Sequence, residues 1–151
     1  MRMQMAAALA LVSVSAWAQN APALNSAGAE QRLRDYVQIW TADEKISPAT
    51  MRTHYADRVT YYGKRMTRQE VLQDKLRFVR TYPVRFYDIA PGSLRTRCRA
   101  SQCVAQAVLV WRRQRTNGLP ESGASALTLV FSSAAHGRIV RESATTLRAS
   151  R

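Results

Sequence analysis

The second half of the chain constrains the fold most, because everything after residue 83 has the pattern of strands separated by turns. The breaks carry turn chemistry at Pro91-Gly92, Asn117-Gly118 and His136-Gly137. Consecutive strands joined by short turns predict a long antiparallel meander. The predicted strands are 84–89, 94–98, 103–115, 126–133 and 138–147.

Helical signals are confined to the first half. Apolar residues recur at three- and four-residue spacing between Glu30 and Thr41, which predicts an amphipathic helix. Ser47-Pro48 predicts the start of a short second helix with Met51 and Tyr55 on its inner face. A short strand over 58–62 follows, and Gly63-Lys64 ends it.

A capping box starts the longest predicted helix. The Thr67 hydroxyl can accept from the Glu70 amide while the Glu70 side chain reaches back, and Pro83 ends the helix near Tyr82. Helices followed by consecutive hairpins predict a single α+β domain over residues 30–147, with the helices packed on one face of a curved antiparallel sheet.

The strand around residues 104–111 is apolar on both faces. A strand of this kind is usually covered on both sides. The helices cover one side, and a second copy of the chain is the candidate for the other, so we expect a homodimer through the sheet face.

Residues 1–18 have the pattern of a signal peptide. Arg2 precedes an apolar run that ends in Ala16-Trp17-Ala18, and the run is too short for a membrane-spanning helix. We expect cleavage near Ala18-Gln19, a periplasmic or secreted bacterial protein without a transmembrane segment in its mature form, and a flexible start over 19–29.

Cys98 and Cys103 are the only cysteines. Disulfides persist in an oxidising compartment, and two thiols with four intervening residues and no nearby histidine make a poor zinc site. We therefore predict a disulfide that closes a hairpin and pairs Thr96 with Ala105.

Several short segments resemble one family. The helix bearing Tyr36 and Trp40, the strand ending in Tyr61-Tyr62-Gly63-Lys64 and the helix closing at Tyr82-Pro83 are similar to the cone-shaped fold of the nuclear transport factor 2-like superfamily, which includes SnoaL-like and ketosteroid-isomerase-like proteins. Together with Asp74-Lys75, they look like an exported bacterial branch without an assigned reaction. The superfamily holds isomerases, polyketide cyclases, dehydratases and epoxide hydrolases beside non-enzymatic binding modules, so the resemblance implies a tapered pocket but no particular activity.

Lys75 is the most informative residue for that pocket, because it falls within the apolar stripe of its helix. A buried ammonium needs a carboxylate partner, while an unpaired lysine reaches along the stripe to water. Glu142 is a candidate partner, because its strand parity places it on an inward face, and Asp57 and Asp74 are alternatives. The pocket candidates are Tyr36, Trp40, Tyr61, Lys75 and Glu142.

Motifs for catalysis are not found in the sequence. The acidic pair of a ketosteroid isomerase and the Asp-Arg-Asp set of an epoxide hydrolase have no match here. Phosphate-binding loops, dinucleotide fingerprints and metal-ligand spacings are absent as well, so we expect no catalytic residue, no cofactor and no metal.

The formal charge is +13, with 20 arginines among the 23 basic residues. Residues 95–151 carry 10 basic against 2 acidic side chains, which places the excess on the predicted sheet. Such a surface suits an anionic envelope component, whereas nucleic acid is not an expected partner of an exported protein. The candidate anionic-partner residues are Arg95, Arg97, Arg99, Arg113 and Arg115.

These patterns favour an exported, non-catalytic binding module whose conical pocket takes a small apolar ligand or a partner segment. The first alternative is an isomerase or dehydratase that uses the same pocket. The second is an envelope-associated accessory protein that binds anionic partners through the arginines of its sheet. A solvated, arginine-rich face without a partner also fits the charge pattern.

Overall fold

The computed structural model describes residues 24–42 and 45–147. The predicted signal peptide and the first residues of the predicted flexible segment lie outside the described residues. The elements are α1 (Ser26–Ile39), α2 (Pro48–His54), β1 (Tyr55–Tyr61), β2 (Lys64–Thr67), α3 (Arg68–Thr81), β3 (Val84–Ile89), β4 (Arg95–Arg99), β5 (Gln102–Gln114), β6 (Glu121–Ser132), the 3-10 helix η2 (Ser133–Ala135) and β7 (Arg138–Leu147). The predicted α+β class is confirmed.

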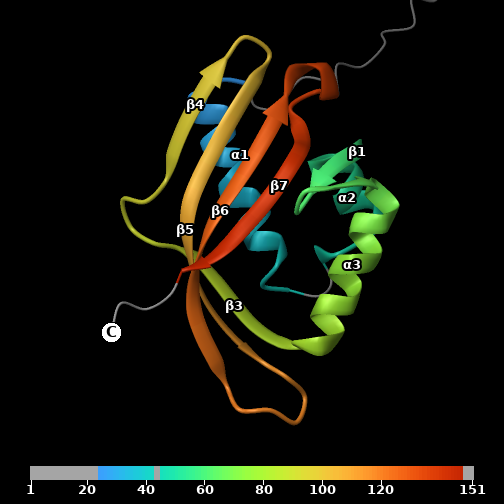
Figure 1. The fold of residues 1–151 in the computed structure, drawn as a ribbon, viewed down its shortest axis with the longest axis vertical. Helices are drawn as coiled ribbons and strands as arrows, with labels where there is room; N and C mark the ends of the chain where they lie inside the picture. Colours follow the sequence, from blue (N-terminus) through green and yellow to red (C-terminus); the bar gives the residue numbers. More distant parts are fainter. Residues whose placement is uncertain (1–23, 43–44, 148–151) are drawn as a thin grey trace, which may run out of the picture.

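All seven strands belong to one sheet, in the order β2-β1-β7-β6-β5-β3, with β4 also paired to β5 (Figure 1). Strand β5 is the longest, and it pairs with β6 along one side. On its other side β4 occupies the first part of β5 and β3 the last part, both antiparallel. Two short strands therefore share one edge of β5.

One strand pair departs from the predicted antiparallel sheet. Strand β1 lies parallel to β7, with Tyr61 opposite Glu142, so the sheet is mixed. Turn residues predict pairing only between consecutive strands. They could not predict this pair, because β1 and β7 lie at opposite ends of the domain's sequence. This single parallel pair brings the first strand beside the last one.

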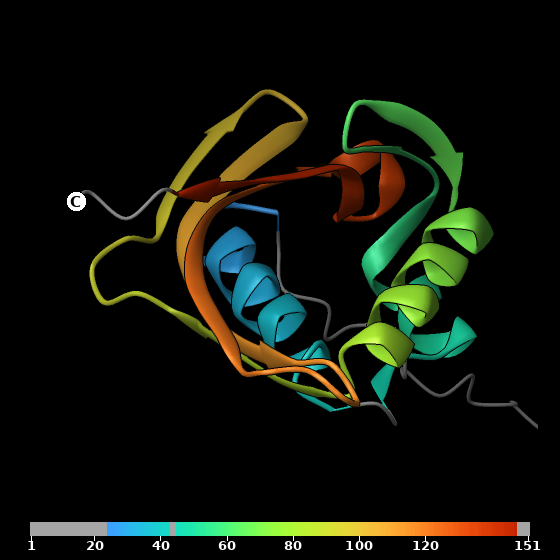
Figure 2. The same cartoon turned by 60° about the horizontal axis from the view of Figure 1, so that its bottom comes forward.

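The helices lie on the inner side of the curved sheet. Figure 2 shows α1 within the hollow of the sheet and α3 on the other side of that hollow. Helix α1 packs on β3, β4 and β5, while α3 packs on β1, β2 and α2. Leu33 of α1, Val71 of α3 and Leu129 of β6 are fully or almost fully buried between these layers. None of the helices in the described ranges is long and apolar enough to cross a membrane.

The capping signals explain where the helices begin. The Thr67 and Glu70 capping box is present at the start of α3, as predicted. Helix α1 begins at Ser26, earlier than the predicted Glu30, because the Asn25 side chain accepts a hydrogen bond from the Gly28 amide. The apolar periodicity did not reveal this cap, since the first turn of α1 is mostly small residues.

Tyr55 does not belong to the second helix, contrary to the prediction. Helix α2 ends at His54, and Tyr55 opens β1, where it faces Ile139 of β7. After β1, Tyr62 and Gly63 both have positive φ and turn the chain into β2, a hairpin that the sequence pattern did not predict. The pairing of β1 with β7 therefore determines the conformation of Tyr55, despite its helical spacing from Met51.

The predicted disulfide between Cys98 and Cys103 is confirmed. It joins directly opposed residues of β4 and β5, and Thr96 lies opposite Ala105 as expected. The bridge therefore closes the β4–β5 hairpin and fixes its register.

The outer face of the sheet combines arginines with exposed apolar residues. Arg95, Arg97 and Arg99 lie opposite Gln106, Val104 and Gln102, so all three point to this face, away from the helices. The other end of the face exposes Val84, Phe86 and Val110, which lie on β3 and β5. A second copy could cover that apolar end, and the homodimer stays a prediction.

Candidate functional site

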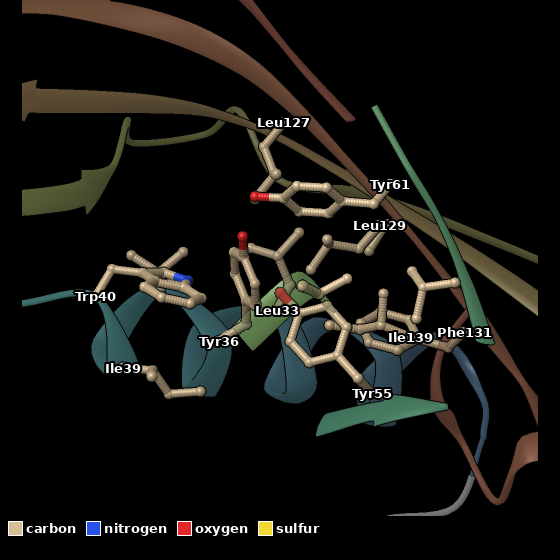
Figure 3. Packing of buried hydrophobic residues seen from close by; sticks show 14 of the residues in the cluster. Leu33, Tyr36, Ile39, Trp40, Tyr55, Tyr61, Leu127, Leu129, Phe131 and Ile139 are labelled. Atoms are coloured by element: carbon tan, nitrogen blue, oxygen red, sulfur yellow. The ribbon is translucent and has the colours of Figure 1, made fainter. Parts of the chain in front are cut away.

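A cavity of about 610 Å³ lies between α1, α3 and the inner face of the sheet. All five pocket candidates, from Tyr36 to Glu142, line it. Four of them come from α1, β1, α3 and β7, which the fold brings together, and Trp40 is the C-cap residue of α1. In Figure 3 the rings of Tyr36, Tyr55 and Tyr61 converge on one space, with Trp40 beside Tyr36.

Glu142 is the centre of the buried end of this cavity and is 1% exposed. Its Oε1 accepts from the Tyr36 hydroxyl at 2.7 Å and from the Lys75 ammonium at 2.8 Å. Its Oε2 accepts from the Tyr55 hydroxyl at 2.5 Å. Three donors thus satisfy one carboxylate, which is how a buried negative charge is tolerated.

Lys75 is held by aromatic rings as well as by Glu142. Its ammonium lies 3.9 Å from the centroid of the Trp40 ring, and the rings of Tyr36, Tyr55 and Tyr61 lie within 6 Å. The negative faces of aromatic rings attract a cation. Lys75 therefore pairs with Glu142, one of the three carboxylates considered from the sequence, and it does not reach to water.

The other two carboxylates that were alternatives for Lys75 have different partners. Asp57 pairs with Arg68 at 2.9 Å. Asp74 pairs with Arg77 at 2.9 Å and accepts from the Tyr61 hydroxyl at 3.1 Å. Asp74 also lines the cavity, nearer to its exposed end.

Burial decides the protonation of this cluster. It raises the pKa of Tyr36 and Tyr55 well above the usual range, and the negative charge of Glu142 adds to the effect. Burial also lowers the pKa of Lys75, although Glu142 opposes that shift. Both hydroxyls therefore remain donors to Glu142 throughout the neutral range.

Trp111 and Arg113 form the wall at the exposed end. The Trp111 ring lies across Gly123, where a Cβ would come within 2.5 Å of it, so the glycine is required for this contact. Trp111 donates its indole N–H to Ser125 at 3.0 Å. The Arg113 guanidinium lies 4.6 Å from the centroid of the Trp111 ring and 4.3 Å from that of Tyr82.

The five candidate arginines do not form one surface, which corrects the expectation of a continuous cationic sheet. Arg113 shares its face with Trp111 and lines the cavity, and Arg115 donates to the Tyr82 hydroxyl at 2.9 Å. Arg95, Arg97 and Arg99 lie on the outer face instead. Arg113 occupies an inward position of β5, whereas the three arginines of β4 lie opposite outward positions of β5, and this separates them.

Tyr55 is the residue that sequence reasoning missed. It is 1% exposed and holds one oxygen of Glu142, yet its position suggested the inner face of a helix. A pairing signal between β1 and β7 could have found it, but one sequence does not provide one. Within residues 24–42 and 45–147, no three His, Cys, Asp or Glu side chains gather as metal ligands.

Removal of the lysine from the buried pair should destabilise the protein strongly. Lys75→Met leaves the Glu142 carboxylate buried without a counter-charge, so we expect a loss of about 3–5 kcal/mol in the free energy of unfolding, measured by urea titration. Arg77→Met breaks the exposed pair with Asp74 and should cost less than about 1 kcal/mol. Equal losses in the two variants would contradict the buried ion pair.

Alkaline pH should destabilise the fold through the buried tyrosines. The unfolded chain releases tyrosine protons near the ordinary value of 10.0, whereas the raised pKa of Tyr55 keeps its proton in the folded state. Stability is therefore retained below pH 10 and falls above it, by about 1.4 kcal/mol per pH unit for each such tyrosine.

Urea unfolding of the native protein and of Tyr55→Phe at several pH values above 10 isolates the contribution of Tyr55, because the shifted groups Tyr36 and Lys75 are present in both proteins. Tyr55→Phe should reduce the slope of stability against pH. An unchanged slope would show that Tyr55 ionises equally in the folded and unfolded protein.

Comparisons with known proteins show the fold. No family model and no curated protein sequence matches the chain. A nuclear transport factor 2-like superfamily protein from Salmonella enterica has a TM-score of 0.65 at 11% identity, over 82% of this chain and 95% of its own. A nuclear transport factor 2-like protein of unknown function from Exiguobacterium has a TM-score of 0.61 at 12% identity, over 77% and 98%.

A SnoaL-like polyketide cyclase from Agrobacterium tumefaciens has a TM-score of 0.58 at 10% identity, over 80% of this chain and 91% of its own. At such low identity the shared feature is the arrangement of helices around a curved sheet. The chain therefore has the fold of the nuclear transport factor 2-like superfamily.

Proposed function

We propose that the cavity binds a small, largely apolar ligand and that the protein is a non-catalytic binding module. The observation that supports this most directly is the state of the two carboxylates that line the cavity. Glu142 accepts from three donors, and Asp74 accepts from Tyr61 and Arg77. Every oxygen of the two carboxylates already accepts a hydrogen bond, so neither stands as an unpartnered general base toward the cavity.

The size and lining of the cavity fit the same proposal. A volume of about 610 Å³ lies in the range of pockets for drug-sized ligands. Leu109, Leu127 and Phe78 give it apolar walls, and the buried end is electrically neutral because Lys75 and Glu142 compensate each other. An apolar molecule can enter without leaving a charge unpaired.

We propose that the module acts in the periplasm or outside the cell. The signal-peptide pattern of residues 1–18 supports export. The disulfide between Cys98 and Cys103 is of the kind that persists in oxidising compartments.

The enzyme alternative uses the same cavity. The similarity in fold to a SnoaL-like polyketide cyclase favours it, and it requires that a substrate displace Tyr36 or Tyr55 from Glu142. Such a displacement would free a carboxylate oxygen for proton transfer. We place it second, because the described cluster is fully hydrogen-bonded without a ligand.

Filling the cavity should abolish binding. With 2-ethylnaphthalene as the probe, we expect saturable quenching of tryptophan fluorescence, since Trp40 and Trp111 both line the cavity. Ala144→Phe adds a ring on the inner face of β7 and should weaken binding on the order of tenfold or more. Ala126→Phe is the matched control, because Ala126 lies on the neighbouring strand and points to the outer face.

Equal affinity in the two variants would place the probe outside the cavity and contradict the proposal. If Lys75→Met binds the probe normally despite its lower stability, the role of Lys75 is structural.

A second candidate function rests on the outer face. Arg97 and Arg141 lie in one row across β4, β5, β6 and β7, with Val104 and Val130 between them. Arg95 and Arg99 flank Arg97 on β4, and within the described residues none of these four arginines has a carboxylate partner. We propose that this outer cationic end, formed by Arg95, Arg97, Arg99 and Arg141, binds an anionic envelope component.

The salt needed to elute the protein from immobilised heparin tests this surface. The triple variant Arg95→Gln, Arg97→Gln, Arg99→Gln should elute at clearly lower salt than the native protein, because it loses clustered charges that salt screens. The control triple Arg34→Gln, Arg58→Gln, Arg80→Gln removes the same charge from exposed positions on α1, β1 and α3. Equal elution of the two triples would mean that only net charge matters.

A further inference from the structure

One buried polar atom in the cavity lining has no hydrogen-bond partner among the described residues. Trp40 is 8% exposed, it lines the cavity, and its indole Nε1–H makes no hydrogen bond within the described residues. A buried donor without a partner costs about 1–3 kcal/mol. Figure 3 shows this nitrogen on the edge of the ring that faces Tyr36, toward the cluster rather than away from it.

Trp111, the second tryptophan of the cavity, has a hydrogen-bonded indole N–H. Trp111 lines the same cavity and donates to Ser125 at 3.0 Å. The fold thus provides an acceptor for one indole and none for the other. This contrast marks the Trp40 N–H as the buried donor of the lining that the described residues leave without an acceptor.

The carboxylate at the buried end is already hydrogen-bonded. Both oxygens of Glu142 are taken by Tyr36, Tyr55 and Lys75. A ligand hydroxyl or amine would have to compete with these three donors for Glu142, so a ligand that accepts a hydrogen bond suits this end better than one that donates. A ligand carboxylate would bring an uncompensated charge beside a neutral ion pair, which is costlier still.

We propose that the ligand presents a neutral hydrogen-bond acceptor, of the ketone or ester carbonyl type, to the Trp40 N–H while its apolar body fills the rest of the cavity. This inference rests on the proposed ligand-binding function and adds the chemical class of the ligand. The Lys75 ammonium, 3.9 Å from the Trp40 ring centroid, reinforces the preference, because it favours the negative end of the carbonyl dipole near that ring.

Two naphthalenes of nearly equal shape test the class. 2-Acetylnaphthalene carries a carbonyl where 2-ethylnaphthalene carries a methylene group. We expect the ketone to bind on the order of fivefold to tenfold more tightly, the worth of one hydrogen bond to an otherwise unsatisfied donor. Trp40→Phe keeps an aromatic ring but removes the N–H, and the ratio of the two affinities should then fall to about one.

The indole region of a proton–nitrogen NMR spectrum provides a measurement on the unmodified protein. The ketone should move the Trp40 indole proton downfield, whereas 2-ethylnaphthalene should not. The Trp111 indole, already bonded to Ser125, is the internal control, and Trp40→Phe assigns the signals.

The possible results distinguish the carbonyl preference from the ligand-binding function itself. Equal affinity for the two probes, or a Trp40 proton that the ketone leaves unmoved, would overturn the carbonyl preference while the ligand-binding function stands. Failure of both probes to bind in the cavity would overturn that function and the preference with it.

Discussion

A single buried carboxylate organises this fold. Glu142 on β7 accepts hydrogen bonds from α1, β1 and α3, through Tyr36, Tyr55 and Lys75. Because a buried charge is tolerated only when its partners are all in place, the three elements have little freedom to shift relative to β7. The parallel pairing of β1 with β7 belongs to the same constraint, since it sets Tyr61 opposite Glu142.

The position of the cavity depends on the distribution of small and large side chains along the inner face of β5. Ala105 and Ala107 lie on the inner face of β5 and are buried in the core, and α1 packs on this strand. Further along the same face come Leu109, Trp111 and Arg113, which line the cavity instead. Small side chains let the helix approach closely at one end, and large ones at the other form walls around a space that α1 does not fill.

Much of this arrangement could be predicted from local patterns. A lysine within an apolar helical stripe and a glutamate at an inward strand position indicated the buried pair, and the capping box indicated the start of α3. Tyr55 could not be predicted, because its place depends on strand β7, far away in sequence. The free indole N–H of Trp40 was equally inaccessible, since a sequence shows that a tryptophan is inward but not which of its atoms lacks a partner.

In the described part of the chain, positively charged side chains have carboxylate partners on the inner face of the sheet but not on the outer face. On the inner side, Lys75 and Arg113 are stacked on aromatic rings and paired with Glu142 and Glu121, so they add little net field to the cavity. On the outer side, the arginines of β4 are exposed and have no carboxylate partner among the described residues. Charge that is compensated favours a neutral ligand, and charge that is not attracts anions. The unpaired arginines of the outer face therefore contribute to the positive charge of the chain, and that charge says nothing against an uncharged ligand within the cavity.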